Sequence, residues 1–322
     1  MIYTKIMGTG SYVPEKVLTN DDLAKIVDTS DEWIASRTGI RRRHIVTDET
    51  TLDLAVHASN RALESSGVDK NDIDLVIVAT VTADHYFPGV SQLLQKRLGL
   101  NNIMAFDINA ACSGFLYALQ VADKMIKSGA YHNVLVVGAE TLTRHTDWSD
   151  RNTCVLFGDA AGAMVISASA DNGIQDVVIG SDGDENSYLI CDTVKLKDPY
   201  KNETSVQDHI HMNGREVFKF ATRIMPQMVR DLLDRNNMSV DDLDYIVAHQ
   251  ANARIIDKAA RDLDFPMEKT YMNIQEYGNT SAASVPLAID EAVRQGLLKR
   301  GDTFITVAFG GGFTWGGALI KY

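Results

Sequence analysis

The chain contains few cysteines and few prolines, and the scarcity of cysteine excludes several classes of protein. Among 322 residues there are three cysteines and six prolines. Cys112, Cys154 and Cys191 are odd in number, and no CxxC pair or Cys/His cluster accompanies them, which argues against a disulfide framework or a zinc site. We therefore expect a reducing compartment, the cytoplasm.

Long apolar runs and an excess of positive charge are also missing. No segment approaches the roughly 18 uninterrupted apolar residues of a membrane-spanning helix, and the opening MIYTKIMGTGSYVP lacks a secretory-signal pattern. The formal net charge of −12 disfavours a nucleic-acid-binding protein. We expect neither a membrane nor a nucleic acid as partner, and an acidic partner would need a local basic patch.

The chain contains one sequence pattern that occurs twice. Each half has, in the same order, an amphipathic helix, a short apolar run led by Asp-x-Asp, and a second apolar run. Strands that alternate with helices predict an α/β fold with mostly parallel sheets. The turn-rich join near 170–173 predicts halves at 1–170 and 171–322, and polar residues 183–208 are interpreted as an insertion. The paired segments are 52–67 with 217–237, 72–80 with 242–250, and 134–140 with 304–310.

Polar side chains stand at the ends of these apolar runs, where ligands gather in α/β folds. Cys112 and Asn279 each lie seventeen residues before a helix-ending glycine, so we expect them at equivalent strand-to-helix junctions, with His249 at the end of a third run. A thiolate is favoured at a helix start, and imidazole and amide N–H groups can stabilise an oxyanion or enolate. Each residue alone also fits a structural role: a core cysteine, a hydrogen-bonded histidine and a helix N-cap.

Longer motifs around these residues point to a family. Cys112 in NAACSGF, His249 in AHQANARII and Asn279 in GNTSAASVP closely resemble the β-ketoacyl-acyl carrier protein synthase III family of the thiolase superfamily. The resemblance covers essentially the whole chain, and it implies a thiolase-like fold of two duplicated βαβαβ-type halves in a layered α/β/α/β/α core. Four further motifs share it, namely GTGSYVP near the start, 28-DTSDEWIASRTGIRRRHI-45, 157-FGDAAGA-163 and 309-FGGGFTWGGALIKY-322.

The resemblance implies a condensing enzyme that initiates fatty-acid synthesis. Cys112 would be acylated by an acyl-CoA, with acetyl-CoA as the expected primer, and malonyl-acyl carrier protein would then lose CO2 and attack the acyl group. His249 and Asn279 would stabilise the enolate, while the backbone N–H groups of Cys112 and Gly311 would hold the tetrahedral oxyanion. The products are 3-ketoacyl-acyl carrier protein, CoA and CO2, and no metal or redox cofactor is required.

The resemblance also implies binding residues and partners. Trp33 and Arg151 match the pair that holds the CoA adenine, and Phe87 matches the residue that reaches across a homodimer interface to close the acyl pocket, where Phe157 also lies. An acidic carrier protein needs a cationic docking patch on this acidic chain. The other matched CoA-binding positions are Thr29, Arg37 and Asn252, and the candidate docking residues are Arg254, Lys258, Arg261, Lys219 and Arg215.

Three alternatives remain open from the sequence. A relative from polyketide or quinolone pathways uses similar motifs, although AHQANARII and GNTSAAS favour primary fatty-acid synthesis. A hydroxymethylglutaryl-CoA synthase would need a glutamate base near the cysteine, and Glu140 lacks a diagnostic context for that role. A silent acyl-CoA-binding protein would not need Cys112, His249 and Asn279 together. The primer is not determined, since acyl groups that differ by a few methylenes are separated by only about 1–3 kcal/mol in an apolar pocket.

Overall fold

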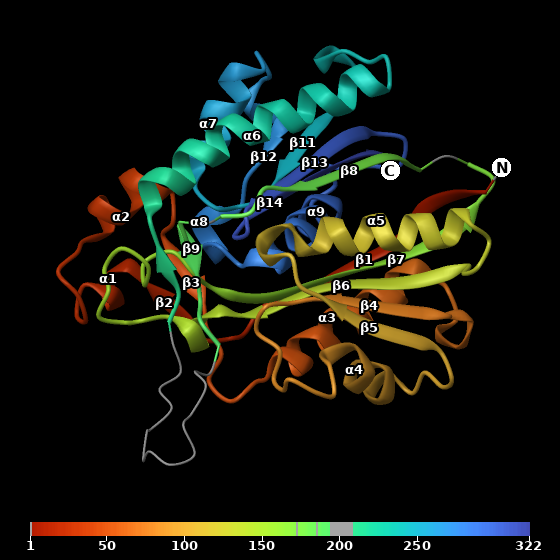
Figure 1. The fold of residues 1–322 in the computed structure, drawn as a ribbon, viewed down its shortest axis with the longest axis horizontal. Coiled ribbons are helices and arrows are strands. Elements are labelled where there is room, and N and C mark those ends of the chain that lie inside the picture. The colour runs from red at the N-terminus through yellow and green to blue at the C-terminus, as the bar shows by residue number, and fades with distance from the viewer. Residues whose placement is uncertain (1, 172, 185, 194–208) are drawn as a thin grey trace.

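Five layers of secondary structure make up the molecule in the computed structural model, which describes residues 2–171, 173–184, 186–193 and 209–322. Figure 1 shows α6 and α7 over one sheet, a central layer of α5 and α9, a second sheet, and then α3 and α4. The layered thiolase-like core expected from the resemblance is confirmed. These helices are α3 (Thr51–Ser66), α4 (Val90–Leu98), α5 (Gly114–Lys127), α6 (Gly214–Arg235), α7 (Ala253–Asp262) and α9 (Ser284–Arg294).

The two sheets have the same topology, which confirms the predicted duplication. In each sheet the first strand along the chain pairs with the last. Three neighbouring parallel strands then follow in the same order. The strands of the first sheet lie within residues 3–169 and those of the second within 174–321. In spatial order they are β1 (Tyr3–Tyr12), β7 (Asp159–Ser169), β6 (Asn133–Thr141), β4 (Leu75–Ala79) and β5 (Met104–Ile108), and then β8 (Ile174–Ser181), β14 (Thr314–Lys321), β13 (Thr303–Gly310), β11 (Tyr245–Ala248) and β12 (Thr270–Tyr271).

The central helices join the halves because both sheets need their apolar side chains. Phe115, Leu116 and Leu119 of α5 are buried in one cluster with Val285 and Ile289 of α9. That cluster takes residues from both sheets, so a single core runs through the middle of the molecule. A helix covered on both faces is apolar over most of its circumference, and α5 has that composition.

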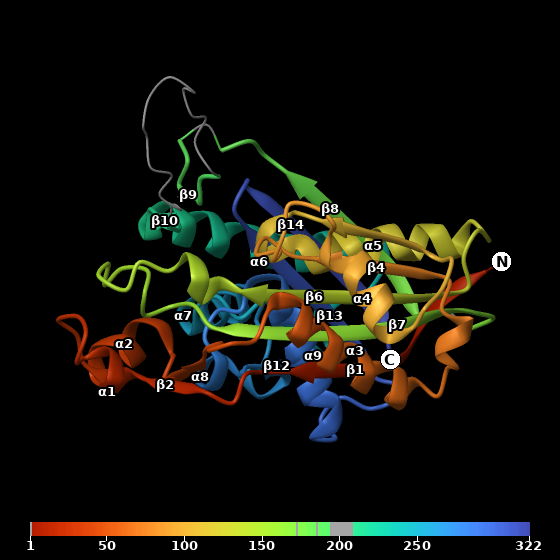
Figure 2. The same cartoon turned by 90° about the horizontal axis from the view of Figure 1, so that it is seen from below.

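Smaller elements gather at one end of the molecule in both views (Figures 1 and 2). Within the predicted insertion the structure describes one short strand, and the strand that pairs with it follows the insertion, while residue 185 and residues 194–208 lie outside the described part. No helix in the described ranges is long and apolar enough to cross a membrane. The small elements are α1 (Asn20–Leu23), α2 (Asp31–Thr38), α8 (Ile274–Tyr277), β2 (Val17–Thr19), β3 (Arg42–His44), β9 (Leu189–Ile190) and β10 (His211–Met212).

Each half also has a strained turn between a strand and its central helix. The first junction turn, Ala111–Ser113, precedes α5, and the second junction turn, Ser281–Ala283, precedes α9; both are single 3-10 turns. The first residue of each has a positive φ, 46° at Ala111 and 48° at Ser281. Such angles are costly outside glycine and often mark functional sites.

The junction turns correct one prediction. Cys112 is the second residue of its turn, so its counterpart in the other half is Ala282 and not Asn279. The predicted equivalence of Cys112 and Asn279 is therefore wrong by three residues. Counting back from the helix ends failed because α9 has 11 residues and α5 has 14.

Candidate active site

Cys112 is a buried thiol at the start of the central helix α5. The first junction turn holds it between β5 and α5. Burial, with a smaller contribution from the nearby carboxylate of Glu140, raises the pKa of the Cys112 thiol to about 11, although a hydrogen bond with Ser281 acts in the opposite direction. The lowered thiol pKa that the sequence suggested for a helix start is therefore not found, because desolvation outweighs the favourable contacts.

Asn279 lies just ahead of the second junction turn with its amide held in one orientation. Its backbone N–H donates to Leu156 O at 2.8 Å, and its carbonyl accepts from Gly158 N at 3.0 Å. Its side-chain Oδ1 accepts from Ser281 N at 2.9 Å. Because the amide oxygen is occupied, the NH2 group is the end that can donate to a ligand.

His249 follows β11 and is buried without a hydrogen-bonding partner for its ring. Its backbone N–H donates to Val307 O at 2.8 Å, and its ring meets Phe309 edge-on with centroids 5.5 Å apart. Neither ring nitrogen has a partner among the described residues, although the side chain is only 1% exposed. Burial lowers the pKa of His249 to about 3, so the imidazole is neutral at physiological pH and presents one N–H donor. An unpaired buried donor is costly, which marks the position as one reserved for a ligand.

A chain of contacts brings the three residues to one place. Phe309, which touches His249, is followed by Gly310, whose backbone lies directly against Cys112. On the other side, Ser281 hydrogen-bonds both the Cys112 thiol and the Asn279 amide oxygen. The thiol, the imidazole and the amide therefore converge where the two halves meet.

Gly310 is required by this close approach, and its replacement gives a first prediction. A Cβ at position 310 would lie 2.6 Å from Cys112 N and 3.0 Å from Cys112 Cβ. Gly310→Ala is therefore expected to displace the first junction turn and to slow alkylation of Cys112 by at least tenfold. Gly183→Ala is the control, because a Cβ there has no neighbour within 4 Å. Mass spectrometry of the Cys112 peptide after iodoacetamide treatment measures the effect, and equal rates in both variants would contradict the prediction.

The predicted nucleotide-binding residues also lie together. The guanidinium carbons of Arg37 and Arg151 lie 4.5 and 4.8 Å from the centroid of the Trp33 ring. Asn252 Nδ2 donates to Arg37 O at 3.1 Å, and the Thr29 hydroxyl is buried without a partner among the described residues. Arginines stacked on an indole provide a flat, cationic surface suited to a base and its phosphates.

The two predicted acyl-pocket phenylalanines are placed differently. Phe157 is buried beside the site, packs against Leu142 and Ile210, and forms a β-bridge to Asn279. Phe87 is 87% exposed on the loop between β4 and α4, so one chain alone does not bring it to Phe157. Gly311, the other predicted oxyanion donor, follows Gly310 directly, and a Cβ added there would lie 3.1 Å from Leu189 O.

Ion pairs reduce the predicted docking patch on α6 and α7. Lys258 pairs with Asp262 at 2.8 Å, and Arg261 pairs with Asp257 at 2.7 Å, both along α7. On α6, the Lys219 ammonium lies 3.8 Å from the Glu216 carboxylate. Arg254 and Arg215 are exposed and form no ion pair with any described residue, so they carry the uncompensated charge.

Two residues at the site were not assigned a role from the sequence. Ser281 lies inside a motif whose asparagine was the residue singled out, and its contact with Cys112 depends on how the two halves pack. Glu140 ends the run VLVVGAE, which is otherwise apolar and buried. A charged residue at that position was the one sequence signal that could have indicated a role for Glu140. Among the described residues, no group of three or more His, Cys, Asp or Glu could hold a metal ion.

The doubled sheet topology and a cysteine at a central helix start define a thiolase-fold condensing enzyme. Residues 106–183 match the profile of 3-oxoacyl-[acyl-carrier-protein] synthase III, and residues 233–322 match its C-terminal profile. The chain belongs to the 3-oxoacyl-[acyl-carrier-protein] synthase III family, and it is an acyltransferase of fatty-acid biosynthesis.

Similar proteins cover the full length of the chain. Beta-ketoacyl-[acyl-carrier-protein] synthase III of Xanthomonas campestris is 54% identical over 100% of this chain and 99% of its own, and the Clostridium acetobutylicum enzyme is 50% identical over 99% and 98%. The crystal structure of 3-oxoacyl-[acyl-carrier-protein] synthase III from Aquifex aeolicus has a TM-score of 0.93 and 46% identity, covering 99% of this chain and all of that one.

Proposed function

We propose that Cys112 is the nucleophile that carries the acyl group. The thiol attacks the carbonyl of an acyl-CoA, with acetyl-CoA as the expected primer, and CoA leaves. The backbone N–H groups of Cys112 and Gly311 stabilise the tetrahedral oxyanion. The observation that carries the proposal is the convergence of a buried thiol, an unpaired neutral imidazole and an oriented amide where the two halves meet.

In the second half-reaction, malonyl-acyl carrier protein occupies the same site. Loss of CO2 leaves an enolate whose thioester oxygen accepts hydrogen bonds from the His249 N–H and the Asn279 NH2. The enolate carbon then attacks the acyl group on Cys112, so the acyl chain gains two carbons and the thiolate is released. The lowered pKa of about 3 keeps the His249 imidazole neutral, so the ring has one N–H with which to donate a hydrogen bond to this oxygen.

CoA binds over the cluster around Trp33. The adenine stacks on the Trp33 ring, and Arg151 and Arg37 supply stacking and phosphate contacts. The unpaired Thr29 hydroxyl and the Asn252 amide offer polar contacts beside them.

The enzyme acts as a homodimer in the cytoplasm. Phe87 and its neighbour Tyr86 are both largely exposed, and paired exposed aromatics suit a partner surface where Phe87 closes the neighbouring acyl pocket. Within one chain, we assign residues 1–170 as the half that carries Cys112 and residues 171–322 as the half that carries His249 and Asn279. Cys112 and Cys154 are free thiols, as suits a reducing compartment.

The carrier protein docks on the exposed arginines of α6 and α7, and Arg254 provides the sharpest test. Arg254→Glu is expected to raise the KM for malonyl-carrier protein by up to about tenfold and to weaken its salt dependence, since steering depends on uncompensated charge. Arg261→Glu is the matched control on the same helix, where Asp257 already neutralises the charge. Steady-state kinetics between low and high salt measure both, and equal changes in the two variants would remove Arg254 from the docking surface.

Intact-protein mass spectrometry tests the proposal as a whole. Incubation with acetyl-CoA is expected to add one acetyl group, and malonyl-carrier protein should then remove it as ketoacyl product. A panel of straight and branched acyl-CoAs in the same assay identifies the preferred primer. If no short acyl-CoA adds mass, the proposal fails.

A further inference from the structure

The loop between β4 and α4 presents two exposed aromatic rings on a short span. Tyr86 is 79% exposed and Phe87 is 87% exposed, and their neighbours His85 and Pro88 are exposed as well. Adjacent large rings in water indicate a place where another surface docks. A side chain that docks is most effective when it is already held in position, because ordering it on contact costs binding free energy.

Asp84 holds this loop three residues before Phe87. Its side chain is only 10% exposed, and its carboxylate accepts from Thr51 N at 3.1 Å and from Leu52 N at 2.9 Å. These are the first two N–H groups of α3, which have no partner inside the helix and lie at its positive end. The loop is therefore attached to the start of a long, buried helix.

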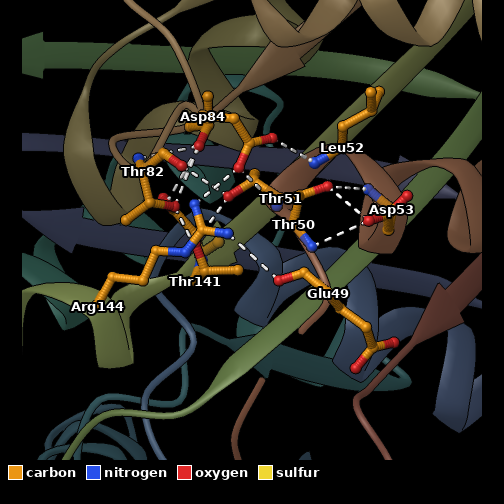
Figure 3. Close-up of polar contacts among 11 residues, drawn as sticks. Glu49, Thr50, Thr51, Leu52, Asp53, Thr82, Asp84, Thr141 and Arg144 are labelled. Atoms are coloured by element: carbon orange, nitrogen blue, oxygen red, sulfur yellow. Dashed lines mark hydrogen bonds and ion pairs between the residues drawn. The ribbon is translucent and has the colours of Figure 1, made fainter. Parts of the chain in front are cut away.

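Arg144 holds the same carboxylate from the other side. Its Nη1 donates to Asp84 Oδ1 at 2.7 Å, and its Nη2 donates to Glu49 O at 3.3 Å. Figure 3 shows Asp84 between Arg144 and the start of α3. Because both side chains are largely shielded from water, this charge-assisted bond is stronger than an ordinary surface ion pair.

Two further contacts fix the backbone on either side of the exposed span. Before it, Thr82 O accepts from Thr51 Oγ1 at 2.6 Å. After it, the carboxylate of Asp107 accepts from Val90 N and Ser91 N, both at 2.8 Å, at the start of α4. The rings are thus carried on a few residues whose two ends are both attached to helix starts.

The helix start does not depend on Asp84 for its own cap. Thr50 and Asp53 form a capping box within α3, and Asp53 pairs with Arg97 of α4 at 3.3 Å. Figure 3 shows Thr50 and Asp53 beside the Asp84 contacts. Since α3 keeps this cap when Asp84 is replaced, the contacts of Asp84 serve to fix the loop. The Asp53–Arg97 pair provides a matched control at the same helix start.

We propose, on the basis of the function proposed above, that Asp84 and Arg144 are positioning residues that hold Phe87 at the neighbouring acyl pocket and so limit the length of the primer. A ring fixed at the end of a pocket excludes chain atoms that would reach past it, whereas a mobile ring gives way. A few methylenes are worth only a modest factor in an apolar pocket, so selectivity for short primers depends on a pocket end that does not move.

Hydrogen exchange measured without any acyl donor tests whether Asp84 fixes the loop. Asp84→Asn keeps the shape of the side chain and one acceptor oxygen, but it loses the ion pair and one backbone bond. Amides in the peptide that spans 80–92 should exchange about fivefold faster or more in this variant, because the loop opens more often. Arg97→Met should exchange like the parent. Equal exchange in the parent and Asp84→Asn overturns the proposal.

The acyl-CoA panel tests the effect on the primer. In Asp84→Asn, the ratio of kcat/KM for hexanoyl-CoA to that for acetyl-CoA should rise about tenfold, mainly through a lower KM for hexanoyl-CoA. Arg144→Met should shift the ratio in the same direction, and Arg144→Lys, which keeps the charge, should shift it less. An unchanged ratio in Asp84→Asn, or an equal rise in Arg97→Met, contradicts the proposal.

Mixed dimers decide which pocket the pair controls. The turn that carries Arg144 also carries Leu142, which packs on Phe157 of the same chain, so an effect within one subunit is the competing explanation. In dimers isolated with two affinity tags, one subunit carries Cys112→Ser and only the other can be acylated. Asp84→Asn placed in the Cys112→Ser subunit should relax the primer ratio of the intact subunit.

The opposite arrangement gives the opposing result. If the ratio relaxes only when Asp84→Asn and an intact Cys112 share a subunit, the pair acts on its own pocket and the proposal is wrong. If the parent enzyme reacts with no acyl-CoA, the function proposed above fails and the limit on primer length fails with it. Hydrogen exchange then still decides whether Asp84 fixes the loop, so the two failures are distinguishable.

Discussion

Cys112→Ser is expected to form no detectable acyl-enzyme with acetyl-CoA or any other short acyl-CoA. A hydroxyl ionises far less readily than a thiol, and no cation among the described residues lowers the pKa of Cys112 to offset its burial. Loss of a nucleophile that acts with its partners as a unit costs on the order of 10³-fold or more. Intact mass after incubation with acetyl-CoA measures the effect.

Cys191→Ser is the matched control for this experiment. Cys191 is exposed and lies outside the junction where Cys112, His249 and Asn279 converge, so its removal should leave the acetyl mass gain unchanged. Peptide mapping distinguishes Cys112 from the buried Cys154. An acetyl group on either other cysteine, or a full mass gain in Cys112→Ser, would remove Cys112 as the nucleophile.

His249→Ala and Asn279→Ala are expected to separate the two half-reactions. Each removes one hydrogen bond to the enolate, which costs on the order of 10²–10³-fold in decarboxylation, whereas transfer of acetyl to Cys112 should change by less than about tenfold. Release of CO2 from malonyl-carrier protein measures the first step, and single-turnover acetylation measures the second.

Asn279→Asp sharpens the test. The aspartate keeps an oxygen to accept from Ser281 N, so the second junction turn remains supported, but it replaces the donating NH2 by a second acceptor. Decarboxylation should therefore fall at least as far as in Asn279→Ala. If all three variants impair acetylation and decarboxylation equally, the division of roles is wrong.

Much of the fold could be predicted because the repeated pattern is local. The Asp-x-Asp leader, the apolar run and the preceding helix recur with constant spacing at 72–80 and 242–250, and the structure places them as equivalent strands. The predicted equivalence of Cys112 and Asn279 failed because it was counted from the C-terminal ends of α5 and α9, and these two helices differ in length. A shorter α9 shifts every count made from that end.

The candidate site was less predictable for a physical reason. The motifs around Cys112 and Asn279 can be recognised one at a time, but the contact of Ser281 with both the thiol and Glu140 arises from packing between halves 140 or more residues apart in sequence. The pKa of the Cys112 thiol likewise depends on burial by both halves. Its position at a helix start predicted a lowered pKa, whereas burial raises it.

The shared central layer has an implication for ancestry. Phe115 of α5 and Val285 of α9 are buried in one cluster that draws on both sheets, so one copy of the repeat alone would expose an apolar face. An ancestor that carried a single copy would have had to pair with a second molecule to cover that face, and a symmetric pair would have carried the same side chains at both junction turns. Fusion of the two copies let the sequences diverge, with a thiol at one turn and Ala282 at the matching place in the other.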